Sequence, residues 1–296
     1  MKRYMGDAAL MITAIVWGSG FVVTAIALQY LTAYQVMAGR FVLATLIMLV
    51  IFGYKLKMFN FSIVWRGAVL GIILYVSFAL QTVGLEYTTP SKNAFITAVN
   101  VVVVPMIAFV IYKRGIDRQE VIASVIALVG IGFLSLQGDL TINFGDFLTL
   151  LCAIGFAFDI FYTNMFVQKE DTLSLTLMQF ITASTLGIIV LAFQGNLTLS
   201  MEKEGMYALI YLAIFSTTIA YVCQNWAFQY TTATRAAIIL STEALFGTIM
   251  SVLILKEILT GRMIFGAVLI MIAILIAELK PFVYLKRRRD ARRQAM

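Results

Sequence analysis

Long apolar segments separated by short polar connections fill most of the chain. About 20 consecutive apolar residues are enough for an α-helix to cross the hydrocarbon core of a bilayer. Ten such segments can be drawn, near Asp7–Ile26, Tyr34–Gly53, Val64–Gly84, Asn93–Tyr112, Val121–Leu136, Phe147–Phe166, Leu175–Phe193, Tyr207–Phe228, Ala236–Leu255 and Met263–Pro281. The pattern therefore predicts an all-α integral membrane protein with ten transmembrane helices.

The segment Gln224–Glu257 is similar to the earlier segment Gln81–Arg114 at an offset of 143 positions. Apolar matches carry little weight where few residue types fill most positions, so the polar matches carry the comparison. They pair Gln81 with Gln224, Tyr87 with Tyr230, Thr88 with Thr231, Thr89 with Thr232, Lys92 with Arg235 and Lys113 with Lys256. A second offset, of 139 positions, pairs the beginnings of the two halves. We interpret the two halves as an internal duplication.

Five spans per repeat is an odd number, so the second repeat enters the membrane in the opposite orientation. We predict a first five-helix repeat over residues 1–138, a second, inverted repeat over residues 139–281 and a basic tail over residues 282–296. Inverted repeats are typical of secondary transporters, whose halves move so that a central site opens to either side of the membrane. Alternating access would explain why the chain is built twice.

Lys and Arg residues gather on one side of this arrangement. Most of the 22 fall in segments on the side of the N-terminus. The positive-inside rule therefore predicts a multi-pass protein of the cell membrane with both termini in the cytoplasm. The tail sequence KRRRDARR is interpreted as an anchor for anionic lipids, with a regulatory partner site as the alternative. It does not imply nucleic acid, and the oligomeric state stays open.

Composition argues against catalysis. The chain is 61% hydrophobic and 12% charged, with a mean hydropathy of +0.95, whereas about 25% of a soluble domain is charged. It has no histidine, and Cys152 and Cys223 stand alone in apolar runs. We therefore expect no metal, no cofactor and no enzymatic activity. The sequence contains no phosphate-binding loop, so we do not expect ATP-driven transport. A membrane enzyme, a channel and a scaffold are weaker alternatives.

Glu243 is the one charged residue between Ala236 and Leu255, and the 143-residue offset pairs it with Asn100. A carboxylate costs about 2.5 kcal/mol or more in hydrocarbon, so it normally faces a cavity or a partner. One interpretation is that Glu243 binds and releases a proton or holds a cationic group of the substrate. The other is that it bridges helices.

Asp159 and Arg40 are the other charged candidates. Asp159 lies one turn before Tyr162 and can bind an amino group or a coupling proton, or be hydrated near an interface. For Arg40 the favoured interpretation is that its side chain extends to the interface or braces a helix end.

A polar stripe follows the fourth span, where Asn93, Thr97 and Asn100 recur at helical spacing above Pro105. Such a stripe faces protein or a cavity, and contact with substrate and helix packing are equally good explanations. The paired amides Gln81 and Gln224 can read a zwitterionic substrate or tie helices together. Aromatic walls for a cavity can come from Trp17, Tyr75, Tyr162, Tyr221 and Trp226, although packing explains most aromatic residues in this chain.

The ordered set of motifs resembles the EamA family of the drug/metabolite transporter superfamily. The motifs are WGSGFV at Trp17–Val22, Gly39-Arg40-Phe41, YTTPSKNAFIT at Tyr87–Thr97 and STEALFG…LKEILT at Ser241–Thr260. The resemblance implies ten helices in two inverted repeats. It also implies that spans one, three, four, six, eight and nine surround a cavity, while spans five and ten lie at the periphery.

Two departures from the family pattern matter. The second-half counterpart of Trp17-Gly18 is Phe156-Ala157, and Ala244 stands where the family often has a proline. A broken ninth helix is therefore not assumed. The resemblance implies a transporter of small metabolites, often amino acids and often outward. Together with the buried carboxylate of Glu243, it leads us to expect a secondary transporter of small organic solutes, with Glu243 as the candidate for proton coupling. Uptake or uncoupled facilitated exchange is the alternative within transport.

Overall fold

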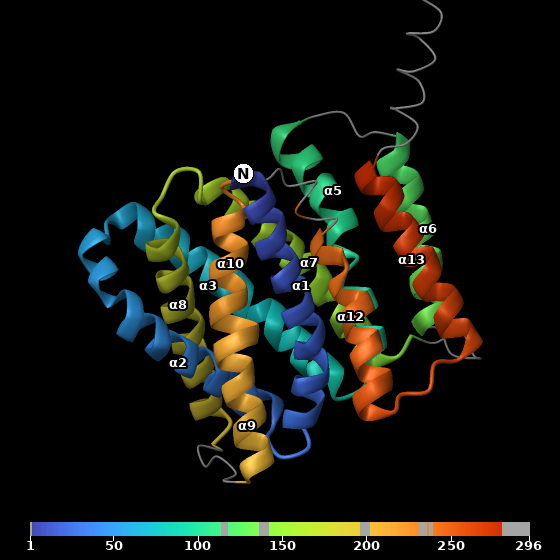
Figure 1. Cartoon of the computed structure of the whole chain (residues 1–296), viewed down its shortest axis with the longest axis horizontal. Coiled ribbons are helices and arrows are strands. Elements are labelled where there is room, and N and C mark those ends of the chain that lie inside the picture. The colour runs from blue at the N-terminus through green and yellow to red at the C-terminus, as the bar shows by residue number, and fades with distance from the viewer. Residues whose placement is uncertain are drawn as a thin grey trace, which may run out of the picture.

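The computed structural model of the chain describes residues 2–113, 118–135, 142–195, 202–230, 236 and 239–279. Over these residues the chain consists of helices joined by turns and short loops, as Figure 1 shows. The predicted all-α class is confirmed for this part of the chain. The basic tail lies outside the described residues.

The helices follow the apolar segments in order. Their bounds are α1 Lys2–Ala27, α2 Ala33–Phe52, η1 Gly53–Met58, α3 Phe61–Leu85, α4 Pro90–Thr97, α5 Asn100–Tyr112, α6 Arg118–Ser135, α7 Phe144–Phe166, α8 Thr172–Phe193, α9 Lys203–Tyr211, η2 Leu212–Ile219, α10 Ala220–Ala227, α12 Glu243–Met250, η3 Ser251–Leu255 and α13 Gly261–Leu279.

Seven of the described helical segments are long and apolar enough to cross a membrane, counting α4 with α5 and α9 with η2 and α10. Three further apolar helices, Val121–Leu134, Ile239–Leu255 and Gly261–Ile276, are shorter. These ten segments overlap the ten apolar stretches of the sequence, and the seven long ones indicate a multi-pass membrane protein.

Helix starts are fixed by side chains that satisfy the first free backbone N–H groups. Thr32 and Gln35 form a reciprocal capping box at α2. The side chains of Asn60 and Asn143 accept hydrogen bonds from backbone N–H groups at the starts of α3 and α7. Thr89 caps α4, whose first position is Pro90. Proline suits that position because the residue there has no intrahelical partner for its N–H.

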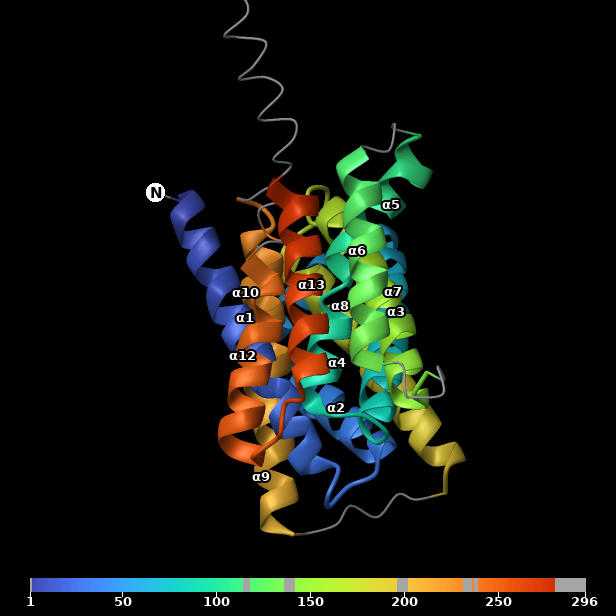
Figure 2. The same cartoon turned by 90° about the vertical axis from the view of Figure 1, so that its right-hand side faces the viewer.

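The helices run roughly side by side (Figure 2), and α6 and α13 pair at one edge of the bundle (Figure 1). Their close approach depends on two glycines, since a Cβ at Gly130 would lie 2.9 Å from the carbonyl oxygen of Gly266. The start of α1 and the last described turn of α13 lie at the same end of the bundle. We call it the N-terminal end.

Two helical segments are interrupted by short irregular turns. Between α4 and α5 the chain makes a tighter turn, in which the backbone N–H groups of Val99, Val101 and Val102 bond to the carbonyl three residues earlier. A similar turn precedes α12, where the backbone N–H of Thr242 bonds to the carbonyl oxygen of Ile239, three residues earlier. The interruption before α12 therefore exists although no proline follows Glu243. Tightened turns within helices often mark functional hinges.

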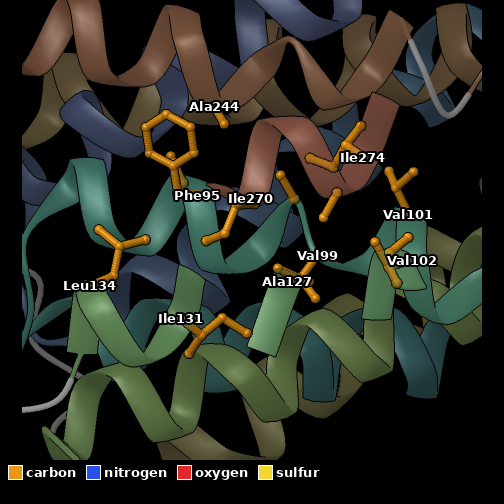
Figure 3. Packing of buried hydrophobic residues seen from close by; sticks show 14 of the residues in the cluster. Phe95, Val99, Val101, Val102, Ala127, Ile131, Leu134, Ala244, Ile270 and Ile274 are labelled. Carbon is orange, nitrogen blue, oxygen red and sulfur yellow. The ribbon is translucent and has the colours of Figure 1, made fainter. Parts of the chain in front are cut away.

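The first of these turns is embedded in apolar side chains. Figure 3 shows Val99, Val101 and Val102 beside Ala127 of α6 and Ile274 of α13, all buried in one cluster. Phe95 and Ala244 belong to the same cluster, so it also joins α4 to α12. The apolar cluster holds one side of the turn and leaves the polar stripe on the other side for the bundle interior.

Ion pairs fasten the helix ends. Lys55 Nζ lies 2.8 Å from an Asp171 carboxylate oxygen, and Arg66 pairs with Glu170. Partial burial alone would raise the pKa of Asp171, but hydrogen bonds from Lys55 and Ser174 outweigh it and hold that pKa below its usual value. At the opposite end of the bundle, Lys92 Nζ lies 3.5 Å from the buried Asp146. These contacts fix the helices around the interior described next.

Candidate functional site

A cavity of about 40 Å³ lies among the helices and gathers polar side chains from both halves of the chain. A single buried water needs about 10–15 Å³ by this kind of measure, so the cavity has room for only a few waters. An organic solute would need the surrounding helices to separate. The lining residues are Trp17, Gly20, Phe21, Thr24, Arg40, Phe78, Gln81, Leu85, Asn93, Thr97, Asn100, Phe156, Asp159, Ile160, Ser216, Tyr221 and Glu243.

The lining comes from the spans that the family resemblance implied, together with α2, which contributes Arg40. The peripheral pair α6 and α13 contributes no lining residue among those the structure describes. Eight of the eleven candidate residues from the sequence line this one cavity. They are Trp17, Gln81, Asn93, Thr97, Asn100, Asp159, Tyr221 and Glu243.

Two acidic side chains and one basic side chain line the cavity. Glu243 is the first residue of α12 and is 5% exposed, and no described residue forms a hydrogen bond or ion pair with it. Asp159 of α7 is buried and accepts a hydrogen bond of 2.9 Å from Gln179 Nε2. Arg40 of α2 is also buried. A carboxylate without a protein partner needs water, a proton or a ligand in such a place.

The position of Arg40 corrects the sequence interpretation. Its guanidinium does not extend to the interface, because the side chain is only 2% exposed and lines the cavity. Its Nε donates to Thr217 Oγ1 at 3.1 Å, and its guanidinium carbon lies 4.2 Å from the ring centroid of Phe78. Arg40 thus lies in the interior of the bundle with the other candidate residues.

The polar stripe of α4 and α5 faces the cavity and also makes hydrogen bonds within the protein. Asn93 Nδ2 donates to Thr149 Oγ1 at 2.8 Å, and Gln81 Nε2 donates to Thr97 Oγ1 at 3.2 Å. Asn100, the first residue of α5, lines the cavity beyond them. The stripe therefore serves both roles that the sequence left open, helix packing and cavity lining.

Aromatic rings form one wall. Trp17 and Tyr221 have ring centroids 5.3 Å apart, and Phe78 packs edge-on against Phe156 at 4.9 Å. The Trp17 indole Nε1 donates to the carbonyl oxygen of Ser216 at 3.0 Å. Ser216 belongs to η2, a segment with π-helical hydrogen bonds, and such segments are frequent at functional sites.

Three candidates lie outside the lining. Tyr75 packs against Phe41 in an apolar cluster, and Tyr162 packs beside Phe161. Gln224 of α10 is fully buried, and neither its Nε2 nor its Oε1 atom has a partner among the described residues. These residue types are suited to a cavity wall, but the sequence pattern does not show which face of its helix each residue occupies.

Among the polar cavity residues, sequence reasoning missed Thr24, Arg40 and Ser216. One signal for Arg40 was present, since the 139-residue offset that pairs Gly20 with Asp159 also pairs Arg40 with Gln179. Asp159 and Gln179 are hydrogen-bonded across α7 and α8. Gly20 and Arg40 are thus the first-half counterparts of a hydrogen-bonded pair in the second half, and both line the cavity.

A second cavity, of about 310 Å³, is larger but lacks charged groups. It lies between α4, α6, α12 and α13 and is lined by Ser91, Phe95, Leu134, Leu245, Thr248, Leu259, Met263, Ile264, Ala267, Val268, Met271 and Ile272. Across the described residues, no group of three or more His, Cys, Asp and Glu side chains is placed to hold a metal ion. The smaller cavity is therefore the candidate site, because its charged and polar lining is suited to a polar solute.

Comparison with known proteins shows the family of the chain. The model of the EamA-like transporter family matches residues 4–136 and again residues 143–279. An uncharacterized transporter of Archaeoglobus fulgidus is 34% identical over 282 residues, covering 95% of this chain and 88% of that protein. The uncharacterized transporter YyaM of Bacillus subtilis is 26% identical and covers 90% of each chain. A crystal structure with 14% identity superposes with a TM-score of 0.66 over 91% of this chain and 95% of that chain, which supports the fold alone. The chain belongs to the EamA-like transporter family and is a multi-pass membrane transporter.

Proposed function

We propose that the protein is a secondary transporter that moves small organic solutes, such as amino acids or related metabolites, by alternating access. The observation that carries the proposal is the cavity that brings Arg40, Asp159 and Glu243 together between membrane-spanning helices. Buried charges in a membrane are expensive and usually mark a substrate or ion pathway. A site with both signs of charge suits a solute that also carries both.

The proposed architecture is ten transmembrane helices in two inverted repeats, over residues 1–138 and 139–281. The family model matches the chain twice, with boundaries close to these. Lys113 and Lys256, which the 143-residue offset pairs, both end their helices with left-handed backbone, at φ 51° and 56°. The proposal also includes both termini in the cytoplasm and a tail, residues 282–296, that binds anionic lipids.

Glu243 is the proposed proton-coupling residue. It begins α12 directly after the tightened turn at Thr242, and it faces the cavity without a hydrogen-bond partner in the described part of the chain. Movement at that turn would change the surroundings of the carboxylate and therefore its affinity for a proton. Outward transport is proposed from the family resemblance. Uptake or uncoupled exchange by the same cavity is the second candidate.

The experiment is flux of a mixed panel of amino acids and small metabolites into proteoliposomes that contain the purified protein, with and without an imposed pH gradient. Protein-free liposomes under the same gradient are the control. Uptake of one solute class that rises with the gradient supports a proton-coupled carrier. Flux that ignores the gradient supports uncoupled exchange instead, and the absence of flux for every solute contradicts the proposed function.

A further inference from the structure

Arg40 is a buried cation with too few partners. A guanidinium has five N–H donors and no acceptor. Nε donates to Thr217 Oγ1 at 3.1 Å, and Nη2 lies 3.5 Å from Ser216 Oγ, at the limit of a hydrogen bond. Among the described residues, no carboxylate lies within ion-pair distance of Arg40. The remaining N–H groups must therefore be satisfied by water or by a ligand.

The surroundings of Arg40 form a built site. Ser216 and Thr217 come from the π-helical segment η2, which the Trp17 indole holds through the carbonyl oxygen of Ser216. A Cβ at Gly20 would lie 2.7 Å from Ser216 Oγ, so a glycine there lets the hydroxyl approach. Phe78 covers a face of the guanidinium at 4.2 Å. Together these groups hold the guanidinium of Arg40, a residue that lines the cavity.

The opposite charges come from other helices. Asp159 of α7 and Glu243 of α12 line the same cavity, and Tyr221 lies within electrostatic range of both carboxylates and of Arg40. A solute that carries a carboxylate and an ammonium group matches this distribution of charge. A dianionic phosphate matches it less well, because two acidic side chains face the same space and would repel it.

We propose that Arg40 binds the carboxylate of the transported solute, an inference that rests on the proposed transport function. A guanidinium and a carboxylate pair through two parallel N–H···O bonds, which lysine cannot reproduce. The carboxylates of Asp159 and Glu243 then face the ammonium group of the solute or a proton. The alternative role for Arg40 is a clamp that ties α2 to η2 without touching the solute.

The first test uses the wild-type protein, so folding of a variant is not an issue. Alanine, leucine and phenylalanine compete in proteoliposomes against the radiolabelled solute identified by the flux panel, and the carboxamide of each is tested beside it. We expect each amide to compete at least tenfold more weakly than its acid. Equal competition by acid and amide overturns the proposal, even if transport itself is measured.

The second test separates solute binding from clamping. Arg40→Lys keeps the charge but loses the fork, and we expect it to raise the KM for the acid about tenfold while the maximal flux and the weak competition by the amide change little. Arg66→Lys, the same substitution outside the cavity, is the matched control and should leave the KM unchanged. If Arg40→Lys weakens acid and amide by the same factor, the residue is a clamp and the proposal fails.

A binding measurement distinguishes failure of this inference from failure of the transport function. The Tm of the purified wild-type protein is recorded with each amino acid and with each amide. A rise with the acids but not the amides, in a protein that moves no solute, supports the Arg40 site while contradicting transport. The same Tm with acid and amide, in a protein that moves neither, overturns both.

Discussion

The two halves of the chain contribute unequally to the cavity. Residues 2–135 supply one guanidinium, from Arg40, and the neutral amides and hydroxyls of α3, α4 and α5. Residues 142–279 supply both carboxylates, from Asp159 and Glu243. If the halves descend from one ancestral repeat, their divergence has separated the charges of the cavity. A solute bound there would meet the cation from one half and the anions from the other.

Corresponding positions keep a similar backbone while the chemistry differs. The 143-residue offset pairs Asn100 with Glu243, and each begins a helix directly after a tightened turn. Asn100 has a similar environment without the charge. If Glu243 couples transport to protons as proposed, the coupling residue lies in the second half only.

The largest expected effect is therefore at Glu243. Glu243→Gln keeps the shape and removes the charge, so flux driven by a pH gradient should fall at least tenfold, a loss of about 1.4 kcal/mol or more in driving the cycle. Asn100→Ala should slow transport while the response to the gradient persists. Both variants are measured by solute uptake into proteoliposomes with and without the gradient.

Solute counterflow at equal pH is the control for both substitutions, because it reports folding and binding without coupling. Glu243→Gln should retain counterflow. Undiminished gradient-driven uptake in this variant would remove Glu243 from the mechanism. An equal loss of the gradient response in Asn100→Ala would show that coupling is not confined to the second half.

The sequence predicted the helices and part of the cavity lining, but not the position of Arg40. The apolar segments predicted the helices because length and composition decide whether a segment can cross a bilayer. The polar stripe predicted that Asn93 and Asn100 face the interior, since exposing amides to lipid is unfavourable. Arg40 was misplaced, because its long side chain can reach either the interface or the interior from a similar depth.

The misses have a common physical cause. Side chains of Tyr75, Tyr162 and Gln224 are as compatible with a cavity as those of Trp17 and Tyr221, and only the rotation of each helix distinguishes them. The helices of this chain are apolar on most sides, so hydrophobic periodicity does not report that rotation. Packing between helices determines it, and single-sequence patterns do not contain that packing.

A smaller effect is expected where the halves pack differently. A Cβ at Gly18 would lie 2.6 Å from the Cβ of Phe246 and 2.8 Å from the backbone nitrogen of Gly247, so Gly18→Ala must push α1 and α12 apart. We expect a cost of about 1–3 kcal/mol from overpacking, seen as a lower Tm of the purified protein. Flux should fall as well, because the contact adjoins Glu243.

The matched change in the other half is Ala157→Gly, at the position that the 139-residue offset pairs with Gly18. Ala157 is buried beside Ile107 and Phe161, so losing its methyl group leaves a small void without a clash. We expect about 1 kcal/mol from added backbone freedom and lost contact, with little change in flux. A Tm loss in Ala157→Gly as large as that in Gly18→Ala would contradict the inferred difference in packing.

The smallest effects are expected at Lys113 and Lys256, where the two halves agree. Both residues adopt positive φ angles, a conformation that costs an L-residue about 1–2 kcal/mol, whereas the loss of backbone entropy with glycine costs about 0.5–1 kcal/mol. Lys113→Gly and Lys256→Gly should each raise the Tm slightly and by similar amounts. Lys→Gln at each position removes the charge, keeps the Cβ and should leave the Tm unchanged. A gain at one position and a loss at the other would mean that the two helix ends are not equivalent, which would weaken the proposed repeat where its backbone geometry matches best.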